Sequence, residues 1–209
     1  MSEKFPKNEP SMENHTDEEV FQNYMEDLKL LPEDFDRKIL DVGSGSSQFA
    51  KWAKDHHVSS QIFSLEPKQE PQEKTKSVQG KAEAIPFQNE AFDLVISNAS
   101  IPNVFLGERP GTVKEKVRNS LFELMRVTKA SGEIRLGRVL KGEIYESQKE
   151  LVSALDEVLE ELRQVYGAEI EEIPYPAANT YEYVNHEPVK LLAKAYLIKI
   201  RKPIFQHEK

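Results

Sequence analysis

An acidic residue followed by a glycine turn is the feature of this chain best suited to holding a small ligand. Residues 38–42 form a mainly apolar run that contains Asp41, and Gly43, Ser44 and Gly45 follow directly. Glycines adopt positive φ and place no Cβ between the backbone and a ligand. The helix expected next directs its free N–H groups at the same place. The pattern therefore predicts a ligand site at this turn.

The spacing around the turn separates two classes of cofactor. A dinucleotide site has the pattern G-x-G-x-x-G/A, whose third small residue lets helix and strand pack closely. Gln48 stands at that position and is too large. Asp41 would repel a pyrophosphate, whereas it suits a ligand with an ammonium or sulfonium group. Glu66 ends the next apolar run and could hold a ribose in either class. The pattern disfavours a nicotinamide dehydrogenase.

Alternating strands and helices must position these residues. Apolar runs bounded by turn residues predict strands, and apolar stripes at helical spacing predict helices. This alternation predicts an α/β fold whose sheet is mostly parallel and covered on both faces. We expect a turn at 129–132 and a loop at 67–74. The expected helices are 16–31, 46–57, 112–128 and 147–166, and the expected strands are 38–42, 61–65, 77–79, 92–97, 133–140, 168–174 and 193–200.

Composition limits the class of protein. The chain has 209 residues, no cysteine, a net charge of −8 and a mean hydropathy of −0.60. It therefore has neither a disulfide nor a thiolate metal site, and no metal site is predicted. The acidic balance makes nucleic acid an unfavoured partner. The chain has no apolar run long enough to span a membrane and no export signal, so no membrane association and a cytoplasmic location are expected.

One domain accounts for most of the chain. Residues 1–15 are polar and proline-bearing, which predicts a disordered tail. Residues 16–209 are expected to form a single domain, and residues 16–35 are expected to be its N-terminal helical cap. The sequence gives no oligomeric state.

Four blocks of residues, in order, resemble the class I S-adenosylmethionine-dependent methyltransferases. The closest resemblance is to the broad group that carries a GxAExLPF segment, and the matched region is about 37–140. This resemblance implies a doubly wound, mostly parallel seven-stranded sheet with the last strand inserted antiparallel. The blocks are ILDVGSG at 39–45, FSLE at 63–66, GKAEAIPF at 80–87 with FDLVISN at 92–98, and LFELMRVTKASGE at 121–133.

The resemblance implies a role for each residue of the first two blocks. Asp41 and the turn of Gly43, Ser44 and Gly45 would cradle the methionine end of S-adenosylmethionine, whose amino group suits Asp41. Glu66 would accept hydrogen bonds from both ribose hydroxyls. Each has a plainer reading: Asp41 could only hold the loop, and Glu66 could be a solvated acid at a strand end.

The third block would bind the adenine and approach the reacting centre. The resemblance implies that the backbone N–H of Ala82 meets the adenine ring, with Glu83 near its amino group, and that Asn98 lies near the sulfonium. Glu83 could equally be a solvated turn acid, and Asn98 could only end its strand. Tyr24, on the N-terminal helix, is more often core than site at such a position, although it could lie over the cofactor.

The chain also departs from the family pattern. Ser47 replaces the usual third glycine, and Lys81 stands where members often have an aspartate that touches adenine. Residues 99–103 contain no recognisable catalytic acid, base or nucleophile, so no catalytic residue is predicted. An activated methyl donor needs mainly an in-line approach, so this lack is compatible with transfer by proximity.

The sequence therefore predicts an S-adenosylmethionine-dependent methyltransferase that acts on a small-molecule acceptor, or alternatively on a protein. The rival hypothesis is a non-catalytic protein that binds S-adenosylmethionine as a regulatory or structural ligand. The segments expected to line the acceptor pocket are 16–31, 99–111 and 175–192.

Overall fold

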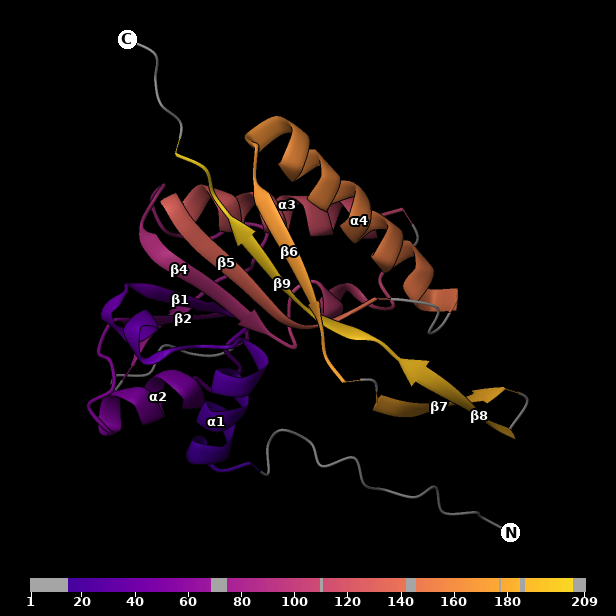
Figure 1. The fold of residues 1–209 in the computed structure, drawn as a ribbon, viewed down its shortest axis with the longest axis horizontal. Coiled ribbons are helices and arrows are strands. Elements are labelled where there is room, and N and C mark those ends of the chain that lie inside the picture. Colours follow the sequence, from indigo (N-terminus) through magenta and orange to yellow (C-terminus); the bar gives the residue numbers. More distant parts are fainter. Residues whose placement is uncertain are drawn as a thin grey trace.

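The fold is a seven-stranded sheet covered by helices on both faces, and Figure 1 shows it in a computed structural model. The structure describes residues 15–68, 75–109, 111–141, 146–176, 178–184 and 187–204. The helices are α1 (Asp17–Asp27), η2 (Pro32–Asp36), α2 (Gln48–Asp55), η3 (Asn103–Phe105), α3 (Val113–Val127) and α4 (Glu146–Tyr166). The strands are β1 (Ile39–Val42), β2 (Ile62–Glu66), β3 (Lys76–Gln79), β4 (Phe92–Asn98), β5 (Thr128–Leu140), β6 (Glu169–Pro174), β7 (Ala178–Val184), β8 (Glu187–Ala193) and β9 (Ala195–Arg201).

The strand order is β3-β2-β1-β4-β5-β9-β6, which confirms the predicted doubly wound sheet. The first five strands in this order are parallel, and β9 is antiparallel to both β5 and β6. The predicted antiparallel insertion of the last strand is thus confirmed. The chain leaves β1 toward β2 on one side and later returns to β4 on the other, so the order reverses between β1 and β4. In such sheets, ligands bind at this reversal, beyond the carboxyl ends of the strands.

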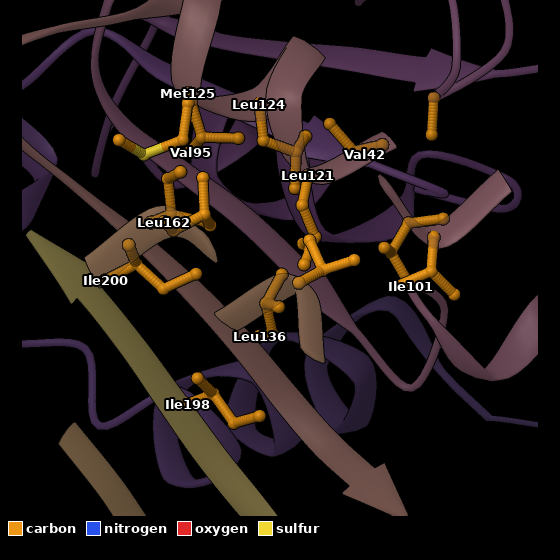
Figure 2. Close-up of a cluster of buried hydrophobic side chains, with 14 of the residues drawn as sticks. Val42, Val95, Ile101, Leu121, Leu124, Met125, Leu136, Leu162, Ile198 and Ile200 are labelled. Atoms are coloured by element: carbon orange, nitrogen blue, oxygen red, sulfur yellow. The ribbon is translucent and has the colours of Figure 1, made fainter. Parts of the chain in front are cut away.

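Each face of the sheet has its own apolar core. Helices α3 and α4 cover one face, and α1 and α2 cover the other (Figure 1). Figure 2 shows part of the first core, where Leu121 and Leu124 of α3 and Leu162 of α4 meet Val95 of β4 and Leu136 of β5. The second core contains the stacked aromatic rings of Phe21, Tyr24 and Phe49. Buried β1 and β4 lie between both cores, as their continuous apolar runs predict.

Helix α1 begins as predicted and ends earlier than predicted. Thr16 and Glu19 form a reciprocal capping box at its start. The helix stops at Asp27 because Lys29 takes a left-handed conformation, with φ of 48°. The N–H of Leu30 then donates to the carbonyl of Met25, which closes the helix in a Schellman-like turn. The expected extension to residue 31 is therefore wrong.

Two other predictions differ from the structure. Strand β5 begins at Thr128 and includes the segment 129–132 that was expected to be a turn, with Ser131 at a φ of 59° and a register shift in its pairing with β4. Residues 178–184 and 187–193 form an antiparallel hairpin, β7–β8, which the sequence had not predicted. The predicted loop at 67–74 and tail at 1–15 lie largely outside the described residues.

A buried charge cluster joins the N-terminal segment to β5. Arg135 donates to Asp34 at 2.8 Å and to Glu133 at 3.0 Å, and all three side chains are buried. Arg135 also donates to the backbone carbonyls of Leu28 and Lys29. Burial disfavours the charged guanidinium, but Glu133 and Asp34 outweigh it and raise the pKa of Arg135. The cluster fixes the chain between α1 and β1 against the sheet.

Among the helices of the described residues, none combines the length and the apolar character needed to cross a membrane.

Candidate functional site

A cavity of about 440 Å³ opens at the carboxyl ends of β1, β2 and β4, where the strand order reverses. Five of the eight predicted site residues line it: Gly43, Ser44, Gly45, Glu66 and Asn98. Helix α1 contributes Val20 and Tyr24, so this helix lies over the turn. Tyr24, which could lie over a cofactor on its sequence position, lies at the cavity.

The glycine turn is held against β2 and is left open toward the cavity. The N–H groups of Gly43 and Ser44 both donate to the carbonyl of Leu65. Gly43 has a φ of 75°, and a Cβ there would lie 1.9 Å from the hydroxyl of Ser100, so only glycine fits. Ser47, at the usual third glycine, is fully buried with a φ of 59°. A small residue at that position therefore permits the packing.

Glu66 reaches the turn from the end of β2. Its Oε2 accepts from the N–H of Gly45 at 3.3 Å, and its Oε1 accepts from the N–H of Lys68 at 3.3 Å. These long bonds leave the carboxylate able to accept further hydrogen bonds at the rim of the cavity. This placement is what a residue that binds a diol requires.

Asp41 is fully buried and poorly compensated. Tyr24 donates to its Oδ1 at 3.4 Å, and its Oδ2 has no hydrogen-bond partner among the described residues. Burial raises the pKa of Asp41 to about 8; the Tyr24 hydrogen bond opposes this shift, and the charge of Glu66 adds to it. Burial and the charge of Asp41 also raise the pKa of Tyr24, so its phenol stays protonated. A cation next to Asp41 would relieve this cost.

Asn98 lies at the end of β4, where it lines the cavity. Its Nδ2 donates to Oδ2 of Asp27 at 3.0 Å, while its Oδ1 is buried without a partner among the described residues. The facing residue of β5 is Gly137, where a Cβ would lie 2.4 Å from Oδ1 of Asn98. The side chain of Asn98 therefore depends on this glycine for its space.

Three predicted residues do not line the cavity: Asp41, which is buried behind Tyr24, and Ala82 and Glu83. Ala82 is packed in the core, and Glu83 is half-buried in the turn beside it. Their segment is clamped by α3: Glu123 accepts from the N–H of Ile85, and Arg126 donates to the carbonyl of Ile85. The clamp joins the third block to the fourth. The roles at adenine stay a prediction.

The sequence analysis missed Asp27 and Arg138. Asp27 accepts from Asn98 and from Nε of Arg138 at 2.5 Å. A signal existed, because Val20, Tyr24 and Asp27 share one helical face, where an acid interrupts an otherwise apolar stripe. Arg138 had no such signal, since β5 contains other charged residues and the left-handed backbone of Arg138, with φ of 53°, follows no pattern in the sequence.

Comparison with known proteins agrees with the fold described above. Residues 40–136 match the family model described as a methyltransferase domain. This match identifies a methyltransferase domain in that part of the chain. No curated protein matches the sequence. The matched segment runs from β1 into β5, and the sheet has a Rossmann-like fold.

Three solved structures share this fold. The chain is similar to the YcgJ protein of Bacillus subtilis, with 15% identity, a TM-score of 0.55, and coverage of 85% of this chain and 98% of the other. A putative methyltransferase of Bacillus halodurans has 14% identity and a TM-score of 0.53, with coverage of 88% of this chain and 99% of the other. A possible histamine N-methyltransferase of Thermotoga maritima has 19% identity and a TM-score of 0.50, with coverage of 87% of this chain and 88% of the other. At these identities, the likeness shows a common fold.

The residues present fit S-adenosylmethionine. Seven buried side-chain polar atoms have no partner among the described residues, and three of them belong to predicted site residues: Oδ2 of Asp41, Oγ of Ser44 and Oδ1 of Asn98. Such atoms are uncommon in folded proteins, and a bound polar ligand is one way to satisfy them. Two carboxylates and an open glycine turn match a ligand with an ammonium group, a sulfonium and a ribose. Among the described residues, no cluster of three or more histidine or acidic side chains could hold a metal ion.

Proposed function

We propose that the cavity at the glycine turn binds S-adenosylmethionine and that the methyl group goes to a small-molecule acceptor. The observation that carries this proposal is a set of unpartnered polar atoms: those of Ser44 and Asn98, which line the cavity, and that of Asp41, which is buried behind the cavity residue Tyr24. Asp41 would meet the ammonium group through the turn, and Glu66 would accept from the ribose hydroxyls. Residues 16–35 would cover the ligand, since Tyr24 already lies at the cavity.

S-adenosylmethionine, when bound, supplies a methyl group that its positive sulfur already activates. The residues then have three tasks: to bind, to orient and to exclude water. The buried wall of Val20 and Tyr24 would exclude water, and Asn98, at the end of β4, would help to orient the ligand. The charged lining is limited, among the described residues, to Glu66. Transfer by orientation therefore suits an acceptor that needs no strong base.

A small acceptor is supported by the shape and charge of the molecule. The cavity and a neighbouring groove of about 610 Å³ have the volumes of small-molecule sites. A net charge of −8 disfavours a long polyanion.

Replacement of Glu66 by alanine tests the ligand. Titration calorimetry with S-adenosylmethionine should show a loss of about 1.5–3 kcal/mol in binding free energy, because a charge-assisted hydrogen bond is removed. Glu115→Ala, which removes an exposed carboxylate on α3, is the matched control and should bind as the wild type does. Unchanged affinity in Glu66→Ala would make Glu66 a surface acid and would contradict the proposed site.

Release of S-adenosylhomocysteine with a panel of small molecules tests the acceptor class. Turnover with a small molecule and not with protein extracts would support the proposal. Turnover with protein alone would overturn the small-molecule part and leave the cofactor site intact.

A further inference from the structure

A second hollow lies beside the cofactor cavity, on the other side of the Asn98–Asp27 hydrogen bond. This groove has a volume of about 610 Å³ and is formed at the ends of α1, β5, β6 and β9. Asn98 lines the first cavity, Asp27 lines the groove, and the two side chains are joined at 3.0 Å. One pair of side chains thus forms the wall that the two hollows share.

Arg138 is the cation built into this wall. Its Nε donates to Oδ2 of Asp27, which is buried. Its backbone is fixed as well: its carbonyl accepts from Nδ2 of Asn103 at 2.9 Å, and its N–H lies 3.4 Å from the hydroxyl of Tyr175. That hydroxyl in turn donates to the carbonyl of Asp27. Arg138 is therefore held in place before any ligand arrives.

The terminal nitrogens of Arg138 are left free. Neither Nη1 nor Nη2 has a hydrogen-bond acceptor among the described residues, and about half of the side chain is exposed to the groove. With Nε taken by Asp27, the two Nη atoms form a planar fork whose geometry matches a carboxylate. The other charged residues of the groove, Glu26 and Lys29, are exposed, and their charges offset each other.

The rest of the groove is apolar. Leu140, Pro174, Tyr175, Pro176 and Ala195 line it. Burial raises the pKa of Tyr175 to about 12, so its ring is a neutral wall at physiological pH. Such a surface accommodates a compact apolar body next to the cation.

We propose that this groove is the acceptor site and that it takes a small carboxylate with an apolar body, whose carboxylate is held by Arg138. The inference rests on the proposed function, because the groove matters for methyl transfer only if the adjoining cavity holds the donor. Asp27 is a positioning residue in this scheme: it orients Arg138 on one side and Asn98 on the other.

Matched probes test the groove in the full chain. Benzoate and 4-hydroxybenzoate are compared with benzamide and 4-hydroxybenzamide, which keep the shape and lose the charge, and with phenyl phosphate. Saturation-transfer NMR detects weak binding, and calorimetry gives affinities. We expect each acid to bind about tenfold or more tightly than its amide, the difference expected for a charged hydrogen-bond pair. Equal binding of acids and amides, no binding by either acid, or a preference for phenyl phosphate would overturn the proposal.

Variants connect the preference to Arg138. Arg138→Gln should abolish the difference between acid and amide, and Arg138→Lys should keep only part of it, because lysine has the charge without the fork. Arg201→Gln removes an exposed arginine at the opposite end of the sheet and should change nothing. Thermal melting checks that Arg138→Gln is folded; if it is not, Arg138→Lys carries the test. An unchanged preference in the folded Arg138 variants would contradict the proposal.

The two proposals fail in different ways. Glu66→Ala should lose S-adenosylmethionine and still bind the acids, whereas Arg138→Gln should bind S-adenosylmethionine normally. Absence of S-adenosylmethionine binding in the wild type would overturn the cofactor site and, with it, the acceptor role of the groove, but not the binding of acids there. Absence of acid discrimination would overturn the groove proposal alone.

Discussion

Asp34 and Asp41 are both buried, and their surroundings are opposite. Asp34 accepts two hydrogen bonds from the guanidinium of Arg135, at 2.8 and 3.2 Å, and further bonds from Arg37 and from the N–H of Leu31. Asp41 has a single long bond from Tyr24, and its Oδ2 has no partner among the described residues. Burial costs a carboxylate several kcal/mol unless it is paired or protonated.

The difference separates a structural acid from a binding acid. The cluster around Asp34 is complete, and every part of it serves to fix the N-terminal segment. The surroundings of Asp41 are incomplete, and the raised pKa of about 8 is the consequence. An acid that the fold leaves uncompensated, beside a cavity, is one that a cationic ligand can complete.

Breaking the complete cluster should have the largest effect. Arg135→Met leaves Asp34 and Glu133 buried without their cation, and we expect a loss of about 3–5 kcal/mol in the free energy of unfolding. Urea denaturation measures this change. Arg201→Met, at an exposed pair with Glu169, is the control and should change stability by less than about 1 kcal/mol. A similarly small change in Arg135→Met would mean that the two acids are not structurally dependent on it.

Asp41→Asn should remove a pH dependence. In the unfolded chain an aspartate ionises near 3.9, whereas Asp41 in the fold stays protonated to about 8. Its contribution to stability is fully present below the lower value and is lost as pH rises toward 8, by about 1.4 kcal/mol per pH unit. Urea denaturation at several pH values from 5 to 8 should show this slope in the wild type and not in the variant.

The control for this pH series is Asp36→Asn, at an exposed acid in η2, which should follow the wild-type curve. Parallel curves for the wild type and Asp41→Asn would show that Asp41 is ionised in the fold and would remove the basis of the comparison.

Tyr24→Phe should have the smallest effect. The lost hydrogen bond is long, so we expect a change of about 0.5–1.5 kcal/mol in the free energy of unfolding. Because that bond lowers the pKa of Asp41, its removal should raise this pKa. The pH at which stability stops falling should then be higher than in the wild type. Tyr166→Phe, whose ring packs on Phe122, serves as the control. A downward shift would contradict the arrangement of Tyr24 and Asp41.

The sequence predicts the sheet and the glycine turn well because their signals are local. The apolar runs ending at Asp41, Glu66 and Asn98 place those residues at strand ends, and parallel pairing brings the ends together. The end of α1 was misjudged because the apolar pattern continues to Leu31, whereas the left-handed Lys29 ends the helix.

Two segments expected to line the acceptor pocket, 16–31 and 175–192, contribute to the groove, but its hydrogen-bonded wall could not be predicted. It depends on Asp27, Arg138 and Tyr175, which come from three elements and meet through hydrogen bonds between residues far apart in the chain. No spacing in the sequence encodes these contacts. The left-handed backbone of Arg138, which turns its side chain toward Asp27, also has no signature in a non-glycine residue.

The position of β9 has a consequence for how the protein comes to be assembled. Strand β6 has β9 as its neighbour in the sheet, so β5 and β6 join only after residues 195–201 insert between them. Pro174 and Tyr175 at the end of β6 and Ala195 at the start of β9 then come together. The contacts of β5 with β9 span a long stretch of sequence, and such pairings form late in folding. During synthesis, the glycine turn can therefore take shape on β1, β2 and β4 well before the second hollow exists.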